Sequence, residues 1–132
     1  MSEEIKPRVL VVDDEESIRI WLKSLLISLG CEVAGEAENG QVGVELFKQE
    51  HPDLVLLDLK MPVMTGDLAL NYILDEDPNA NVVFLSAVRD WEEVRDALMG
   101  GAHDYLAKDD PPEKIRAALQ KQIEKIESKA KT

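Results

Sequence analysis

Short apolar segments alternate with longer amphipathic stretches along the whole chain. Five segments are short enough to be strands, and they cover residues 8–12, 32–37, 53–58, 81–86 and 104–107. Most of them are apolar at nearly every position, as in the segments RVLVV and DLVLL. Continuous apolar runs of this length are typical of strands buried on both faces of a sheet. The pattern therefore predicts a sheet that is covered on both sides.

Segments with helical spacing separate the predicted strands. In the first, apolar side chains recur at intervals of three and four before Gly30, at Ile18, Trp21, Leu22, Leu25, Leu26 and Leu29. This spacing predicts an amphipathic helix. Further helices are predicted over residues 41–50, 67–76 and 90–99, and the last begins at Pro111-Pro112, since proline is tolerated in a first turn. Strands that alternate with helices predict an α/β fold with a parallel sheet and right-handed crossovers.

Polar side chains stand where the predicted strands end. Asp13 and Asp14 follow the first strand, Asp58 ends the third, Ser86 ends the fourth and Lys108 follows the fifth. We expect these side chains to converge, because ligands bind outside the carboxyl ends of the strands in such a sheet. Close carboxylates repel one another unless a cation intervenes. An all-oxygen set of ligands favours a hard divalent cation such as Mg²⁺.

The same edge has the chemistry of phosphoryl transfer. Asp58 follows four apolar residues that hold its backbone rigidly, and its carboxylate can act as a nucleophile towards phosphorus. A metal ion and the Lys108 ammonium would offset charge on the transferring group, while the Ser86 hydroxyl donates a hydrogen bond.

These motifs resemble the receiver domain of bacterial two-component response regulators. The matching segments are VLVVDDEE, PDLVLLDLKMPVMTG, VVFLSA and GAHDYLAK, which follow in this order over about residues 7–122. The resemblance implies a doubly wound, five-stranded parallel sheet of order 2-1-3-4-5 with five helices. It divides the chain into a receiver domain over 6–123 and a C-terminal extension of the last helix over 124–132.

The resemblance also implies how the phosphoryl group and the metal are held. Asp58 would accept the group from a sensor histidine kinase or a histidine phosphotransfer protein. Asp14, Asp58 and the backbone carbonyl of Lys60 would bind Mg²⁺ or Mn²⁺ directly, and Asp13 would act mainly through a metal-bound water. Ser86 and Lys108 would hold phosphoryl oxygens.

A switch is implied next to this site. Tyr105 matches an aromatic position that turns inward when Ser86 moves towards the phosphoryl group. This movement would change the face formed by the fourth helix, the fifth strand and the fifth helix, and so control a downstream protein or a fused output domain. The chain would be a signalling protein and not an enzyme, apart from its own phosphorylation and autodephosphorylation.

Two lysines raise questions of their own. The family usually places proline in a cis peptide bond after the site lysine, but here Asp109 follows Lys108. A non-proline cis bond costs about 2.5–4 kcal/mol, so the bond is either trans with a rearranged loop or cis and strained. Lys60 lies two residues after Asp58. Its side chain either leans over the phosphoryl site and hinders water, or is a solvated loop lysine.

The end of the chain extends the last helix. Leu119, Ile123, Ile126 and Ala130 form an apolar stripe with a coiled-coil-like spacing. The stripe is short, and three roles remain open for it: a homodimer contact, a helix that leads to an output domain, or a frayed end.

Composition narrows the class of protein. The chain of 132 residues has the length of one domain, and its formal charge of −12 argues against direct binding of nucleic acid. No apolar run approaches the roughly 20 residues of a membrane helix. A single cysteine excludes an internal disulfide and fits a reducing cytoplasm, which is the expected location.

Three other functions compete with the phosphorylation switch. An aspartate-nucleophile phosphohydrolase usually places a second aspartate two residues after the nucleophile, where this chain has Lys60. A flavin or nucleotide binder needs a glycine- or hydroxyl-rich loop after the first strand, where this chain has DDEE. A scaffold that works without phosphorylation remains open because the proline after Lys108 is missing.

Overall fold

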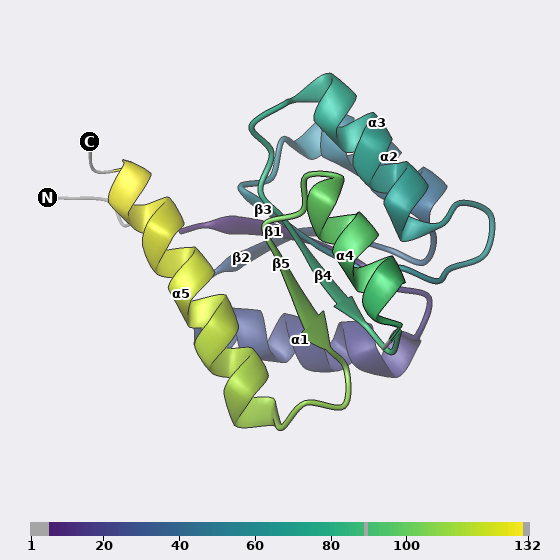
Figure 1. The fold of residues 1–132 in the computed structure, drawn as a ribbon. Coiled ribbons are helices and arrows are strands. Elements are labelled where there is room, and N and C mark those ends of the chain that lie inside the picture. Colours follow the sequence, from purple (N-terminus) through teal and green to yellow (C-terminus); the bar gives the residue numbers. More distant parts are fainter. Residues whose placement is uncertain (1–5, 89, 131–132) are drawn as a thin grey trace, which may run out of the picture.

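Five strands and five helices alternate in the computed structural model, which describes residues 6–88 and 90–130 (Figure 1). The strands are β1 (Arg8–Val12), β2 (Glu32–Ala37), β3 (Leu54–Leu57), β4 (Val82–Ser86) and β5 (Asp104–Ala107). The helices are α1 (Glu16–Ser28), α2 (Gly40–Glu50), α3 (Gly66–Glu76), α4 (Trp91–Met99) and α5 (Pro112–Ala130). The predicted order of elements is confirmed, with bounds that differ by a few residues.

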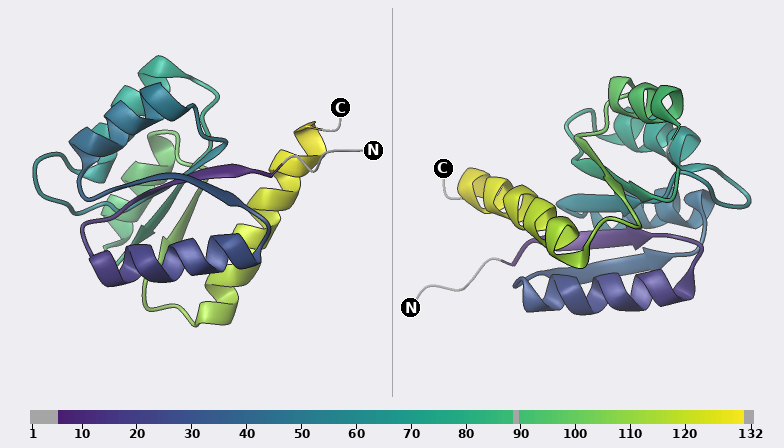
Figure 2. Two further views of the ribbon diagram at one scale, coloured as in Figure 1. Left: turned by 180° about the vertical axis from the view of Figure 1, so that it is seen from behind. Right: turned by 60° about the horizontal axis from the view of Figure 1, so that its bottom comes forward.

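All strand pairs are parallel, and the order across the sheet is β2-β1-β3-β4-β5. Helices α1 and α5 cover one face, and α2, α3 and α4 cover the other (Figures 1 and 2). The predicted fold class is therefore confirmed. The central strands β1, β3 and β4 are buried along nearly their whole length, as their continuous apolar sequences predicted.

Each face of the sheet has its own hydrophobic core. On one face, Leu22 and Leu26 of α1 and Ile115, Leu119 and Ile123 of α5 pack against alternate residues of the strands. On the other, side chains of α2, α3 and α4 pack against the intervening strand residues. Because successive side chains of a strand point to opposite faces, one apolar run supplies both cores. The two cores hold the strands in place, and so they fix the positions of the polar residues at the strand ends.

The apolar stripe of the last helix packs against the chain's own core. Leu119 and Ile123 are buried, and the half-buried Ile126 packs against the same cluster. The side chain of Ala130 and the last residues, 131–132, lie outside the described part. The role of the extension over 124–132 therefore stays a prediction. None of the described helices combines the length and hydropathy that a membrane crossing would require.

Candidate functional site

Strand register brings the predicted acids together. Val12 of β1 pairs with Leu57 of β3, so the next residue of each strand, Asp13 and Asp58, lie side by side. The backbone continues the ladder at both positions, because the Asp13 N–H donates to Ala37 O and the Asp58 N–H donates to Val12 O, each at 2.9 Å. Both carboxylates are buried. The neighbouring strands β1 and β3 thus hold the two aspartates in place.

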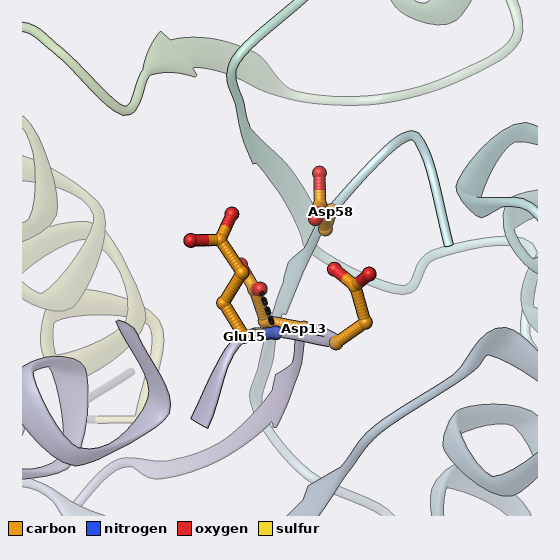
Figure 3. A group of neighbouring side chains, drawn as sticks. Asp13, Glu15 and Asp58 are labelled. Carbon is orange, nitrogen blue, oxygen red and sulfur yellow. Dashed lines mark hydrogen bonds between the residues drawn. The ribbon is translucent and has the colours of Figure 1, made fainter. Parts of the chain in front are cut away.

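Four carboxylates gather at this edge. Ligand oxygens of Asp13, Asp14, Glu15 and Asp58 lie within 4.8 Å of one another. Figure 3 shows three of them, Asp13, Glu15 and Asp58, coming together from the β1–α1 loop and the end of β3. The Glu15 N–H donates to Asp13 Oδ1 at 2.9 Å, which fixes the turn between β1 and α1. The group provides only oxygen ligands, so it could hold a hard divalent cation.

The electrostatics of the two buried aspartates favour a nearby cation. The pKa of Asp13 is raised to about 6, chiefly by burial and also by the neighbouring Asp58 charge, while the backbone hydrogen bond from Glu15 lowers it. Burial also raises the pKa of Asp58, while hydrogen bonds from Lys108 and Ser86 lower it. Burial disfavours the ionised form of both carboxylates, and a cation bound between them would favour it.

Lys108 is the only cation that the structure places inside this group, among the described residues. Its side chain is 9% exposed, and its Nζ lies 3.0 Å from Asp13 Oδ2, 2.8 Å from Glu15 Oε1 and 3.0 Å from Asp58 Oδ2. Burial alone would lower the pKa of Lys108, but the hydrogen bonds to these acids outweigh burial and raise it. The lysine is therefore a permanent positive charge at neutral pH.

The peptide bond after Lys108 is trans, because no cis bond occurs in the described residues. The loop turns at Asp110, whose N–H donates to Ala107 O at 3.0 Å and whose Oδ2 accepts from the Ala107 N–H at 3.3 Å. The Lys108 N–H donates to Ser86 O at 2.9 Å, which extends the β4–β5 ladder by one step. A turn closed by an aspartate thus aims the lysine at Asp58 without a cis proline.

Ser86 and Tyr105, the two residues of the predicted switch, lie on the neighbouring strands β4 and β5. Ser86 ends β4 and is buried, and its side-chain hydrogen bond to Asp58 lowers the pKa of that aspartate. Tyr105 is half-buried in β5 and packs its ring against Phe84, with the ring centroids 6.1 Å apart. Its hydroxyl donates to Val88 O at 2.7 Å, in the loop between β4 and α4. The tyrosine therefore links the strand ends to the start of α4.

The loop between β3 and α3 passes close behind Asp58. A Cβ atom on Gly66 would lie 2.1 Å from the Asp58 carbonyl oxygen, so only glycine fits there. In the same loop Val63 has φ 70, and the Met64 N–H donates to Pro62 O at 2.7 Å across it. A β-branched residue rarely adopts this left-handed conformation. The loop thus keeps a strained backbone next to the site.

Lys60 points to α4. Its Nζ lies 3.2 Å from Glu93 Oε1, in the first turn of that helix. The side chain is 64% exposed, which fits the solvated loop lysine weighed from the sequence, and its ammonium pairs with Glu93.

Glu93 was missed in the sequence, as was the extent of the contacts that Lys108 makes. The sequence predicted that Lys108 would converge with Asp13 and Asp58, and the structure adds Glu15 as a partner. Glu15 carries a signal, because it directly follows the aspartate pair. Glu93 carries none, since its contact depends on how α4 lies beside the β3–α3 loop.

Comparison with known proteins gives the same assignment along most of the chain. The family model described as response regulator receiver domain matches residues 9–120. The chain is 41% identical over 114 residues to the chemotaxis protein CheY of Thermotoga maritima, which covers 86% of this chain and 95% of that protein. It is 38% identical over 120 residues to the nitrate/nitrite response regulator protein NarL of Escherichia coli, or 90% of this chain and 56% of that protein.

Solved structures show the same architecture. The CheX–CheY–BeF₃–Mg²⁺ complex from Borrelia burgdorferi contains a chain that is 30% identical, with a TM-score of 0.83 over 92% of this chain and 90% of that one. The receiver domain of AraT, a response regulator from Geobacillus stearothermophilus, is 28% identical, with a TM-score of 0.85 over 96% of this chain and 99% of that one.

Proposed function

The chain belongs to the family of response regulator receiver domains, signalling modules of two-component systems, and we propose that phosphorylation of Asp58 switches it on. One observation carries the proposal: the buried Asp58 carboxylate lies 3.0 Å from the Lys108 ammonium, inside an oxygen cluster suited to a cation. An aspartate in this setting is desolvated, held rigidly and supplied with positive charge on one side. These are the conditions that a carboxylate nucleophile needs.

The phosphoryl group would come from a phosphohistidine on a sensor histidine kinase or a histidine phosphotransfer protein. An Asp58 carboxylate oxygen attacks phosphorus and forms an O–P bond as the N–P bond breaks. The bonding electron pair goes to the imidazole nitrogen, which takes a proton from solvent. Lys108 and the Ser86 hydroxyl then hold phosphoryl oxygens. The group leaves when a water oxygen attacks phosphorus, which regenerates the Asp58 carboxylate and releases inorganic phosphate.

The oxygen ligands fit Mg²⁺ or Mn²⁺. Asp14, Asp58 and the Lys60 backbone carbonyl would hold the ion directly, and Asp13 would hold it through a water. The ion would offset negative charge on the phosphoryl oxygens as they approach the carboxylates. The presence of Mg²⁺ and BeF₃ in the complex of the Borrelia relative supports this assignment.

The output would be a change on the face formed by α4, β5 and α5. The phosphoryl group adds a charge of about −1.5 to −2, and Ser86 moves towards it. Tyr105 then loses its place on Val88 O and turns inward, which couples the site to this face. A downstream protein, a fused output domain or a second copy of the chain would read the change in the cytoplasm. Apart from phosphoryl transfer at its own Asp58, the chain would have no enzymatic activity.

Binding of beryllofluoride tests this proposal. Beryllofluoride adds to an aspartate as a stable mimic of the phosphoryl group, and we expect the wild type to bind it only when Mg²⁺ is present. Isothermal titration should show saturable binding by the wild type and none by Asp58→Asn. A wild type that binds Mg²⁺ but no beryllofluoride would favour the scaffold that works without phosphorylation.

A further inference from the structure

One lysine lies on the wall of two cavities. The first, of about 280 Å³, is the phosphorylation site, and Lys60 lines it together with Asp58, Ser86 and Lys108. The second, of about 300 Å³, lies between α3 and α4, and Lys60 lines it together with Glu93. Lys60 therefore borders both cavities.

In this structure the ammonium pairs with a residue of the second cavity. Lys60 Nζ pairs with Glu93 Oε1 at 3.2 Å, and the two side chains are 64% and 43% exposed. An ion pair this exposed is weak, because water screens it and two long side chains lose freedom to form it. A modest competing charge is enough to draw the lysine away from Glu93.

Phosphorylation would supply that charge. A phosphoryl group carries about −1.5 to −2 at neutral pH, more than the single charge of a glutamate. Lys108 is already shared among Asp13, Glu15 and Asp58, so the added charge has room for a second cation. Among the described lysines and arginines that line the phosphorylation cavity, Lys60 is the one whose ammonium pairs outside it.

We propose that Glu93 is a positioning residue for the phosphorylation site, which holds Lys60 away from Asp58 until the phosphoryl group arrives. The inference rests on the proposed phosphorylation of Asp58. Once transferred, the Lys60 ammonium covers a phosphoryl oxygen and hinders the attacking water. The same exchange removes the ion pair between the β3–α3 loop and α4, so the helix loses a contact with the site. Glu93 thus sets the lifetime of the phosphoryl group through Lys60.

A double-mutant cycle tests the inference. Glu93→Gln removes the carboxylate that competes for Lys60. If phosphorylation must break the Lys60–Glu93 ion pair, linkage requires that a variant without this pair favours the phosphorylated state. We expect Glu93→Gln to slow dephosphorylation, and to tighten binding of beryllofluoride with Mg²⁺, by about two- to five-fold, the range of an exposed ion pair. In a Lys60→Gln background, Glu93→Gln should change neither quantity. Glu93→Asp, which keeps the charge, should restore values near those of the wild type.

The matched control is Glu92→Gln. Glu92 is the exposed neighbour of Glu93 in the first turn of α4, so the variant removes the same charge from the same helix. It should leave the phosphoryl lifetime unchanged. The inference is overturned if the wild type is phosphorylated normally and Glu93→Gln behaves like Glu92→Gln, or if the effect of Glu93→Gln persists without Lys60. Failure of the wild type to form any adduct overturns the proposed function instead.

Discussion

Lys108 balances three acids with one charge. Its ammonium lies within 3.0 Å of carboxylate oxygens of Asp13, Glu15 and Asp58. No single one of these pairs neutralises the group, which has four carboxylates in all. The remaining negative charge is what would attract a divalent cation, and the lysine keeps the site compact until the cation binds. Lys108 is therefore an electrostatic counterweight to the acids, and we propose that it also binds the phosphoryl group.

The backbone conformation of Val63 lowers the free energy of unfolding of the chain. Its φ of 70 costs a non-glycine residue about 1–2 kcal/mol, and its side chain is 80% exposed, so it gains little from packing. Asparagine adopts a positive φ more readily than a β-branched residue, and it lacks the extra chain entropy of glycine. We expect Val63→Asn to raise the free energy of unfolding in urea by about 1 kcal/mol.

Alanine provides the comparison at this position. Val63→Ala removes the branched side chain but keeps a Cβ atom, so its gain should be smaller than that of asparagine. If Val63→Asn has the same stability as the wild type, the left-handed backbone at this position is absent in solution.

Most residues of the candidate site could be predicted from the sequence, while some of the ion pairs around it could not. Asp13, Asp58, Ser86 and Lys108 were picked out because each ends or directly follows a strand, and the ends of parallel strands meet at one edge. The Lys60–Glu93 pair depends on how a helix lies beside a loop, which local sequence does not encode. The trans bond after Lys108 was left open because either geometry satisfied the sequence.

Among the elements, the β3–α3 loop is one on whose path the site depends. The Gly66 N–H donates to Leu59 O at 2.8 Å, which draws the start of α3 against the end of β3. This approach leaves no room for a side chain, and it sets the direction of the Lys60 carbonyl and of the Asp58 backbone. The loop therefore couples the start of a helix to the geometry of a proposed metal site.

Gly66→Ala should disturb both stability and binding. The added Cβ atom would lie 2.1 Å from the Asp58 oxygen and 2.9 Å from the Leu59 Cα, which are backbone atoms that cannot rotate away. We expect a loss of about 1–3 kcal/mol in the free energy of unfolding, together with weaker binding of Mg²⁺ measured by titration calorimetry.

Gly35→Ala is the control for this substitution. A Cβ atom on Gly35 would meet its nearest neighbours, side-chain atoms of Leu10 and Leu46, at an ordinary 3.5 Å. This variant should bind Mg²⁺ like the wild type. Normal Mg²⁺ affinity in Gly66→Ala would show that the loop does not position the site.

Helix α5 illustrates where element-level prediction is ambiguous. Its apolar spacing fitted a seam for another helix, but Leu119 and Ile123 are buried beneath the helix itself, against the sheet and α1. A helix that covers a sheet and a helix that pairs with another helix need similar apolar stripes. Sequence spacing alone cannot separate the two.

At the scale of the whole molecule, the fold places a group of four carboxylates at one end of the sheet while its two cores lie on the faces. This arrangement separates the cost of the site from the stabilisation that the cores provide. The order of elements and the parallel sheet followed from alternating periodicities, and the strand order followed from the family resemblance. Which charged side chains of the site pair with one another, in contrast, depends on distances that are set only in the folded chain.

The buried aspartates make stability depend on pH. The pKa of Asp13 rises from 3.8 to about 6 on folding, chiefly because of burial, so between these values the folded state binds more protons than the unfolded state. The free energy of unfolding must then fall as pH rises through this range. Without metal, we expect Asp13 to contribute a loss of about 1 kcal/mol between pH 5 and pH 7.

Urea unfolding at pH 5 and pH 7 with a chelator measures this loss. Mg²⁺ should reverse it at pH 7 and have less effect at pH 5, where protons compete for the carboxylate. Asp13→Asn should reduce the pH dependence, with a remainder from Asp58, whose pKa is also raised by burial. A variant with the same pH dependence as the wild type would contradict the assignment to Asp13.

The central claim, that Asp58 accepts a phosphoryl group, is tested most directly by intact-mass spectrometry after incubation with acetyl phosphate. The account predicts one phosphoryl adduct on the wild type in the presence of Mg²⁺. It predicts no adduct when Mg²⁺ is chelated, and none on Asp58→Asn. A wild type without adduct in saturating Mg²⁺, or an adduct that persists in Asp58→Asn, would contradict it.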